Sequence, residues 1–284
     1  MTSPDHHFKV FLLGVGAQKA GTSWLHEQLH NRHDADFGFC KEYHILDALT
    51  LPQFAHFQPK HSLPWKWRTW RRKRFLQNSS RYFDYFCNLL QCPSNRLTGD
   101  ITPSYGCLSA DTLQWTREQF SERGVTTRVV FLMRDPVERI LSQQRMKLRK
   151  RGELHPDAEQ EQLRRTARTL QQRSSQRSDY LHTLQALSQA FSSDDLFIDL
   201  YERLFTESVY QRLCQHLMID YQEPNWSRRV NESRTTTNLP EDVLASIGQS
   251  QALIYNNVAQ QFPHLDLARH WPLASRWCRS INNN

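Results

Sequence analysis

The stretch Lys9-Val-Phe-Leu-Leu-Gly-Val-Gly16-Ala-Gln-Lys-Ala-Gly21-Thr22-Ser23 decides the fold of this 284-residue chain. Its first seven residues, which are apolar after Lys9, have the length and composition expected for a buried strand. Two glycines at G-x4-G spacing follow, and a helical pattern begins at Thr22, which we expect to be the N-cap. A strand, a glycine loop and a helix in this order are typical of phosphate-binding α/β proteins.

Glycine is scarce in the rest of the chain. Only nine glycines occur among 284 residues, and three of them, Gly14, Gly16 and Gly21, fall within this one stretch. A chain that concentrates its glycines in one place needs unusual backbone conformations or close approaches there. The cluster therefore favours a specialised turn.

The glycine spacing is that of a phosphate loop, but the lysine stands elsewhere. In nucleotide triphosphatases the lysine follows the second glycine, and the next hydroxyl holds Mg²⁺. Here Thr22 occupies that position, and the lysine is Lys19, inside the loop. Loop amides and the helix start can still bind an anion. A triphosphate carries enough charge to need Mg²⁺ beside the lysine, whereas a phosphosulfate carries less, so one lysine and the loop amides could hold it without metal. The plain alternative is a structural turn with a surface lysine.

Strand and helix patterns alternate along the rest of the chain. Apolar runs predict further strands at 97–102, 127–133 and 195–201. Helical patterns cover 22–29, 136–150, 180–191, 207–218 and 240–260. The polar residues 151–178 indicate a solvated helix or lid, and 225–239 a loop. The alternation predicts a P-loop-type three-layer α/β fold, with a central, mostly parallel sheet flanked by helices, in one domain over 1–284.

A second motif, Arg134-Asp-Pro-Val-Glu-Arg139-Ile-Leu-Ser142, follows the strongest of these strands. Asp135 has the features of a helix cap. Arg134 and Ser142 both lie where they could contact one phosphate at the carboxyl end of the sheet. For Arg139 we favour a structural ion pair with one of the neighbouring acidic residues.

The two motifs together resemble those of the sulfotransferase superfamily, which uses 3′-phosphoadenosine 5′-phosphosulfate (PAPS). Residues 18–24, Gln-Lys-Ala-Gly-Thr-Ser-Trp, are similar to its 5′-phosphosulfate loop, and residues 134–142 match its 3′-phosphate motif. The segment 228–234 is similar to the N-x-S-R loop of bacterial members. The resemblance implies these PAPS-binding residues: Lys19, Ala20, Gly21, Thr22, Ser23, Trp24, Arg134, Ser142 and Arg234. For Trp24, packing in the core is an equal alternative.

The segment Lys41-Glu-Tyr-His-Ile-Leu-Asp47 resembles the K-E-x-H-[FY]-[FL]-D segment of Golgi carbohydrate sulfotransferases and their bacterial relatives. That resemblance implies Glu42 as general base, with His44 as its orienter or an alternate base. It implies Asp47 as a support and Lys41 as a ligand of the sulfuryl group or acceptor. The alternative without a catalytic role is a solvated Lys-Glu pair beside a packed histidine.

A third segment, Gly99-Asp-Ile-Thr-Pro-Ser-Tyr105, is similar to the family's G-[ED]-x-T-P-x-Y pattern near the acceptor cleft. The resemblance makes Thr102, Ser104 and Tyr105 candidate acceptor contacts. A plain turn after a strand explains the same residues equally well.

The sequence therefore predicts a PAPS-dependent sulfotransferase that acts by in-line transfer, with Lys19, Glu42 and His44 as catalytic residues and no metal. The acceptor would be a hydroxyl of a carbohydrate, a small metabolite or a lipid. One alternative is a P-loop small-molecule kinase. Another is a non-enzymatic binder of nucleic acid or polyanions through Trp65–Arg74, within a basic and aromatic insertion at 51–95.

Composition narrows the setting. A net charge of +7 favours anionic partners. The six cysteines include no Cys-x-x-Cys pair, so we expect reduced thiols in a cytoplasmic protein. We find no apolar run of membrane-spanning length and no secretory signal. His6 and His7 are more consistent with a disordered start than with a metal site.

Overall fold

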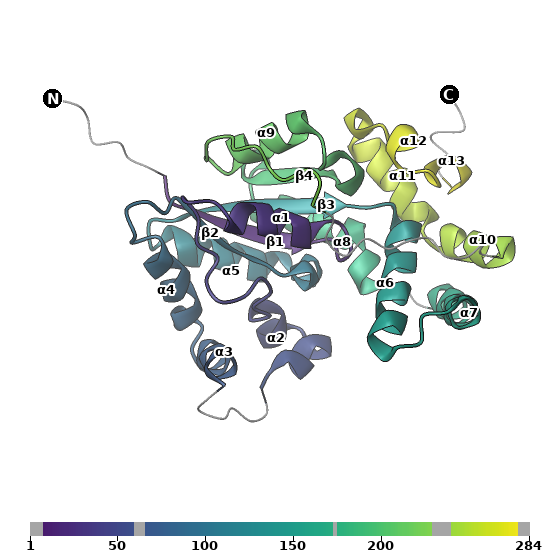
Figure 1. Cartoon of the computed structure of the whole chain (residues 1–284), viewed down its shortest axis with the longest axis horizontal. Helices are drawn as coiled ribbons and strands as arrows, with labels where there is room; N and C mark the ends of the chain where they lie inside the picture. The colour runs from purple at the N-terminus through teal and green to yellow at the C-terminus, as the bar shows by residue number, and fades with distance from the viewer. Residues whose placement is uncertain (1–7, 60–65, 173–174, 229–239, 278–284) are drawn as a thin grey trace.

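The computed structural model describes residues 8–59, 66–172, 175–228 and 240–277 (Figure 1). Its centre is a four-stranded sheet in the order β2-β1-β3-β4, in which every neighbouring pair is parallel. The strands are β1 (Val10–Gly16), β2 (Leu97–Ile101), β3 (Thr126–Met133) and β4 (Leu196–Leu200). The sequence placed each of them within a few residues.

The strands are buried on both faces, as their continuous apolar runs require. All seven residues of β1 are buried, and so are all five of β2. Val10 pairs with Leu97 on one side and with Thr126 on the other, so β1 lies in the interior of the sheet.

Helices cover both faces of the sheet (Figure 1). Helices α1 (Thr22–His30) and α9 (Glu207–His216) pack on one face, where Trp24 meets Tyr210 at 5.8 Å between ring centroids. Helices α5 (Ala110–Ser121) and α8 (Tyr180–Ala190) cover the other face and contact one another. The predicted three-layer α/β fold with a parallel sheet is confirmed.

The remaining helices extend this frame. They are α2 (Leu46–Thr50), α3 (Trp67–Gln77), α4 (Ser80–Leu89), α6 (Pro136–Arg151), α7 (Pro156–Gln172), α10 (Glu241–Ser250), α11 (Ala252–Gln261), α12 (Leu267–His270) and α13 (Ala274–Trp277). Helix α7 is less solvated than its polar sequence suggested, because Glu159 is fully buried and its Oε1 lies 2.5 Å from Nε of Arg145.

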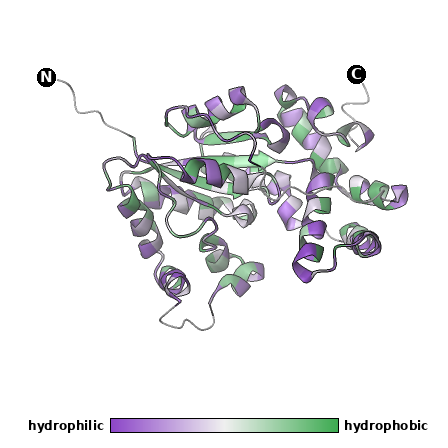
Figure 2. Cartoon of the chain, in the orientation of Figure 1, coloured by the Kyte–Doolittle hydropathy of each residue, from purple (hydrophilic) through white to green (hydrophobic). Residues whose placement is uncertain are grey.

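The stretch 51–95 is mostly helical where it is described. Helix α4 packs firmly, with Tyr82, Phe83 and Phe86 fully buried, whereas α3 buries only Phe75. Figure 2 shows the same contrast, with hydrophobic strands at the centre and hydrophilic residues along the outer helices. Whether this stretch is an insertion, and whether 1–284 is one domain, stay predictions.

The sequence led us to expect unpaired cysteines and no membrane-spanning segment. The five described cysteines are all unpaired, although only Cys107 and Cys214 are buried. In the described ranges, no helix is both long and apolar enough to cross a bilayer.

The strand order places a crevice in the middle of the sheet. From β1 the chain moves to β2 on one side and then crosses back to β3 on the other. The segments that leave β1 and β3 therefore diverge at the carboxyl edge, and open α/β sheets bind ligands at such a point. The loop after Gly16 and the turn at Arg134 are those two segments.

Candidate active site

The glycine loop joins β1 to α1 through a left-handed residue. Gly21 has φ of 75° and is the N-cap of α1, so the expectation that Thr22 caps this helix is wrong. A Cβ at Gly21 would lie 2.8 Å from the ring of Tyr201, so a larger residue does not fit. No side chain caps the helix start, which leaves its first amide groups available to an anion.

Lys19 stands in this loop among other cations. Its backbone is also left-handed, with φ of 72°. Burial lowers the pKa of Lys19, and the positive charges of Arg134, Arg149, Lys150 and Lys41 lower it further. A bound anion would relieve this repulsion, so the surroundings of Lys19 favour a negatively charged ligand.

The second motif reaches the same place from β3. Asp135 caps α6 as predicted, accepting hydrogen bonds from the amides of Val137 and Glu138. Nη1 of Arg134 donates to the carbonyl oxygen of Lys19 at 3.0 Å, and its guanidinium lies 5.0 Å from the ring centroid of Tyr201. The two motifs, 115 positions apart, are therefore in direct contact.

Both motifs open on one cleft of about 650 Å³. Its described lining contains six cationic side chains against a single carboxylate, that of Glu42, and three aromatic rings. The lining residues are Gln18, Lys19, Gly21, Thr22, Ser23, Trp24, Lys41, Glu42, Pro103, Arg134, Ser142, Met146, Arg149, Lys150, Tyr201, Phe205 and Arg228. The cleft is suited to a strongly anionic ligand that carries an aromatic group.

Several of these residues were missed by the sequence analysis. Arg149 and Lys150 lie on α6 beyond Ser142, and their place in a basic helix end gave no signal that they turn toward the cleft. Tyr201 and Phe205 follow β4, where a residue at the carboxyl end of a strand is a fair candidate for a site. Trp24 is 2% exposed and belongs to the core, yet it also lines the cleft.

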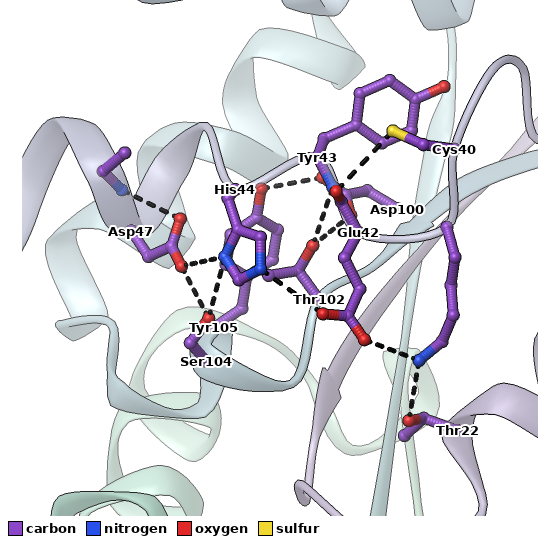
Figure 3. A network of polar contacts seen from close by, with 12 residues as sticks. Thr22, Cys40, Glu42, Tyr43, His44, Asp47, Asp100, Thr102, Ser104 and Tyr105 are labelled. Atoms are coloured by element: carbon purple, nitrogen blue, oxygen red, sulfur yellow. Dashed lines mark hydrogen bonds and ion pairs between the residues drawn. The ribbon is translucent and has the colours of Figure 1, made fainter. Parts of the chain in front are cut away.

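The segment after α1 places a carboxylate beside the loop (Figure 3). Nζ of Lys41 donates to Oε1 of Glu42 at 2.8 Å, and also to Oγ1 of Thr22 at 3.1 Å and Oγ of Ser23 at 3.3 Å. One ammonium group thus joins the hydroxyls of the glycine loop to the predicted base.

His44 lies between two carboxylates (Figure 3). Its Nε2 is 3.3 Å from Oε2 of Glu42, and its Nδ1 is 2.7 Å from Oδ2 of Asp47. The ring also stacks on Phe57, with centroids 3.5 Å apart. These contacts fix the position of the imidazole behind the carboxylate of Glu42.

Neighbouring charges and hydrogen bonds shift the pKa values of Glu42 and His44. Burial opposes ionisation of Glu42, but the hydrogen bond to His44 and the charge of Lys41 outweigh it and lower the pKa to about 2. Burial likewise disfavours imidazolium at His44, yet the hydrogen bonds to Asp47 and Glu42 raise its pKa overall. Glu42 is therefore ionised at neutral pH.

The candidate acceptor contacts lie behind the cleft. Thr102, Ser104 and Tyr105 are at most 2% exposed, and none is among its described lining residues. Oγ of Ser104 donates to Asp47 at 2.6 Å, while Oγ1 of Thr102 and the Tyr105 hydroxyl donate to Asp100 at 2.6 and 2.7 Å. They hold the segment that carries Glu42 in place.

Asp100 is the centre of this support. It also accepts from the Tyr82 hydroxyl at 3.0 Å and from the amide of Tyr43, next to Glu42, at 3.3 Å. Complete burial raises the pKa of Asp100 to about 6. Four donors thus compensate a carboxylate that water does not reach.

Two further predicted residues, Arg139 and Ala20, stand apart from the cleft. Arg139 is fully buried, donates to Oγ of Ser178 and contacts Gln143, so the expected ion pair with Asp135 or Glu138 is wrong. Burial lowers the pKa of Arg139 to about 10. Ala20 is buried in the core. Arg234 and the pair His6-His7 lie outside the described residues.

Metal ligands do not gather in the described ranges, where no group of three His, Cys, Asp or Glu residues could hold an ion.

Among comparisons with known proteins, only the comparison with solved structures gives matches. No model of a known protein family matches the chain, and no curated protein matches it. Among solved structures, a sulfotransferase from Alicyclobacillus acidocaldarius aligns over 92% of this chain and 98% of its own, with a TM-score of 0.59 and 17% identity.

Two sulfotransferase domains align less well. The domain of the Synechococcus PCC 7002 olefin synthase has a TM-score of 0.45 at 14% identity, over 87% of this chain and 96% of its own. The domain from the curacin biosynthetic pathway has a TM-score of 0.42 at 16% identity, over 76% and 75%. The alignment with the Alicyclobacillus structure shows that this chain has the fold of a sulfotransferase.

Proposed function

We propose that this protein transfers a sulfuryl group from PAPS to an acceptor hydroxyl. The observation that carries the proposal is the contact between the two motifs, which brings the glycine loop and Arg134 onto one cationic cleft beside Glu42. The fold found in the Alicyclobacillus sulfotransferase supports the same function.

The loop residues fit the phosphosulfate end of the donor. The uncapped start of α1 offers amide donors, and Thr22 and Ser23 add hydroxyl groups in the cleft. Lys19 supplies the positive charge at the point where the leaving phosphate would gain charge during transfer. Its lowered pKa reflects crowding by cations, which an anion relieves.

The other end of the donor would lie toward α6 and α9. Arg134 and Ser142 would hold the 3′-phosphate, as their motif implies, and Arg149 and Lys150 extend the positive lining beyond them. The rings of Trp24, Tyr201 and Phe205 give the cleft an aromatic side that suits adenine.

Glu42 would accept the proton of the acceptor hydroxyl. As the acceptor oxygen forms its bond to sulfur, the bond between sulfur and the phosphate oxygen breaks, and the leaving phosphate keeps that electron pair. His44 and Asp47 hold the carboxylate in position through contacts of 3.3 and 2.7 Å.

Lys41 would adjust the strength of this base. A pKa of about 2 makes Glu42 a weak base, and Lys41 is one cause of that value. A phosphosulfate bound at Thr22 and Ser23 attracts the Lys41 ammonium, which already contacts both hydroxyls. As the ammonium moves toward the donor, the pKa of Glu42 rises toward a useful range.

The acceptor class rests on the sequence resemblance. Residues 41–47 resemble the Golgi carbohydrate enzymes and their bacterial relatives, so we propose a hydroxyl of a carbohydrate or small metabolite. A P-loop kinase is disfavoured because Thr22 occupies the position of the kinase lysine, and its Oγ1 accepts from Lys41. No metal is required in this proposal, because cationic side chains face the donor.

Calorimetric titration with adenosine 3′,5′-bisphosphate, the product of the donor, tests the proposal. We expect binding without Mg²⁺ and stronger than that of ATP with Mg²⁺. Lys19→Met should weaken binding at least about tenfold. Lys147→Met, on α6 but outside the cleft lining, is the matched control. Magnesium-dependent ATP binding, with none of the bisphosphate, would contradict the proposal and favour a kinase.

A further inference from the structure

A second groove lies between α3 and α4, and the proposed reaction does not use it. It has a volume of about 490 Å³ and shares no lining residue with the cleft beside Glu42. Its lining is Trp67, Trp70, Arg71, Arg74, Phe75, Arg81, Asp84, Tyr85, Asn88 and Leu89. Figure 1 shows α3 at the lower edge of the molecule, away from the sheet.

Positive charge on α3 has no counterpart in the structure. The helix carries five cations and no acidic residue: Arg68, Arg71, Arg72, Lys73 and Arg74. Among the described residues none of them, nor Arg81, forms an ion pair with a carboxylate. The one acid in the groove, Asp84, is bound to Nε of Arg123 at 2.8 Å.

Such crowding weakens a helix, because like charges three and four positions apart repel one another. Arg71 and Arg74, and Arg68 and Arg72, are pairs of this kind. An anionic partner lying along α3 would remove this penalty. The charge of the groove therefore points to a negatively charged ligand.

Two large rings stand exposed among these cations. Trp67 is 50% exposed and Trp70 is 43% exposed. The guanidinium of Arg74 lies 4.6 Å from the Trp70 ring centroid, and that of Arg68 lies 5.4 Å from the Trp67 centroid. One face of each indole is thus occupied, and Trp67 also meets the ring of Phe39 at 5.3 Å.

We propose that the groove and outer face of α3 bind the surface of an anionic phospholipid membrane. Arginines beside half-exposed indoles match such an interface, where cations meet lipid phosphates and indoles enter the boundary of headgroups and chains. Arg71, Arg74 and Arg81 would contact the headgroup phosphates, and Trp67 and Trp70 would insert beside them.

The ring contacts favour a membrane over single-stranded nucleic acid. Bases stack on open aromatic faces, and here guanidinium groups already occupy one face of Trp67 and one face of Trp70, which leaves less ring surface for stacking. Insertion into a lipid interface needs only the half-exposed parts of the indoles and leaves these contacts intact. A small soluble anion would gain nothing from the exposed rings.

Co-sedimentation of the full chain with phospholipid vesicles tests the proposal. We expect binding to phosphatidylcholine vesicles that contain about a third phosphatidylserine and at least tenfold weaker binding to pure phosphatidylcholine. Binding should weaken as salt increases. The emission of the exposed indoles should shift to shorter wavelength when the protein binds.

Two variants separate charge from insertion. The double substitution R71Q/R74Q should reduce binding to the anionic vesicles at least tenfold, and W67A/W70A should do so while keeping every positive charge. The matched control is R164Q/R168Q, which removes two exposed arginines from α7. It should stay within about twofold of the unmodified chain. Unchanged circular dichroism and bisphosphate binding would show that the variants are folded.

Three outcomes would overturn the proposal. They are no binding to the anionic vesicles, an equal loss in the α7 control, and binding of a single-stranded oligonucleotide without binding of vesicles. The last outcome would assign the groove to nucleic acid. None of them bears on the cleft, because sulfuryl transfer and bisphosphate binding are measured without lipid.

Discussion

Nη1 of Arg134 donates a hydrogen bond of 3.0 Å to the carbonyl oxygen of Lys19. This bond joins the turn after β3 to the glycine loop after β1, and it holds the loop in the conformation in which Lys19 faces the cleft. Arg134 also lies over Tyr201, whose ring in turn excludes a side chain at Gly21. The cleft is therefore assembled around a single guanidinium group.

Replacing Arg134 by alanine should weaken binding of adenosine 3′,5′-bisphosphate at least about tenfold, because a charge-assisted bond and the loop contact are both lost. Arg134→Lys should recover only part of the affinity, since an ammonium group cannot reproduce the planar contact with Tyr201. Calorimetry measures both. Equal affinities in all three proteins would show that Arg134 does not face the ligand.

Glu42→Gln preserves the shape of the side chain and removes its basicity. With an acceptor that the unmodified enzyme sulfates, we expect turnover to fall at least about a hundredfold. Bisphosphate affinity should stay within about threefold, because Glu42, the one acid among the described lining residues, supplies no positive charge or hydrogen-bond donor to a phosphate. Retention of most of the turnover would transfer the role of base to another group.

Asp47→Asn tests the support behind the base. Burial lowers the pKa of His44, and hydrogen bonds to Asp47 and Glu42 raise it. Loss of the Asp47 charge should therefore lower the pKa of His44, as measured by NMR titration of its imidazole. Asp157→Asn, an exposed residue at the start of α7, should leave it unchanged. A constant pKa in both variants would mean that Asp47 does not act on His44.

Gly21→Ala and Gly124→Ala form a matched pair. Both glycines have positive φ, 75° and 69°, but only Gly21 faces a neighbour, the Tyr201 ring at 2.8 Å. Gly124→Ala should cost about 1 kcal/mol of unfolding free energy. Gly21→Ala should cost more and should also weaken bisphosphate binding. If denaturant unfolding gives similar losses of unfolding free energy for the two variants, the Tyr201 ring can move aside without an energetic penalty.

Acid should destabilise the protein partly through His216. Burial lowers the pKa of His216 to about 4, with a contribution from Arg128. The unfolded chain takes up this proton near pH 6.5, so stability falls as the pH drops from there to about 4. The loss attributable to this residue is at most about 3 kcal/mol.

His216→Gln can keep the hydrogen bond to the carbonyl of Val129, which His216 makes at 3.1 Å, without titrating. The difference in unfolding free energy between pH 7 and pH 4.5 should therefore be smaller in this variant. Denaturant unfolding at both pH values measures it. An unchanged difference would mean that the pKa of His216 is not lowered in the folded protein.

Much of the fold was readable from the sequence because the strands are continuous apolar runs and α6 has a strong start signal. Asp135 followed by proline predicted its helix correctly. The helix α1 was expected from Thr22, where it begins, but its cap was placed one residue too late. A left-handed glycine cap carries no side-chain signal, whereas Thr22 is a common capping type.

The placement of residues in the cleft was predictable where a motif carried it, as for Lys19, Thr22, Ser23 and Arg134, all of which line the cleft. Their roles there stay predictions. The position of a residue was not predictable from the sequence where the residue is buried behind the cleft. Arg139 has acids beside it in sequence, but the helix turns it into the interior, toward Ser178. Thr102, Ser104 and Tyr105 donate to buried carboxylates instead of lining the cleft, and a linear pattern cannot distinguish these two placements.

The strand order β2-β1-β3-β4 has a consequence for how the protein must be made. Of the four described strands, β1 is synthesised first and lies inside the sheet, so both of its partner strands are made after it. Until β3 is added, one edge of β1 has unpaired amide and carbonyl groups, and Lys19 lacks its contact with Arg134. A nascent chain that ends before residue 126 therefore has an open strand edge and lacks the part of the cleft that Arg134 and α6 supply.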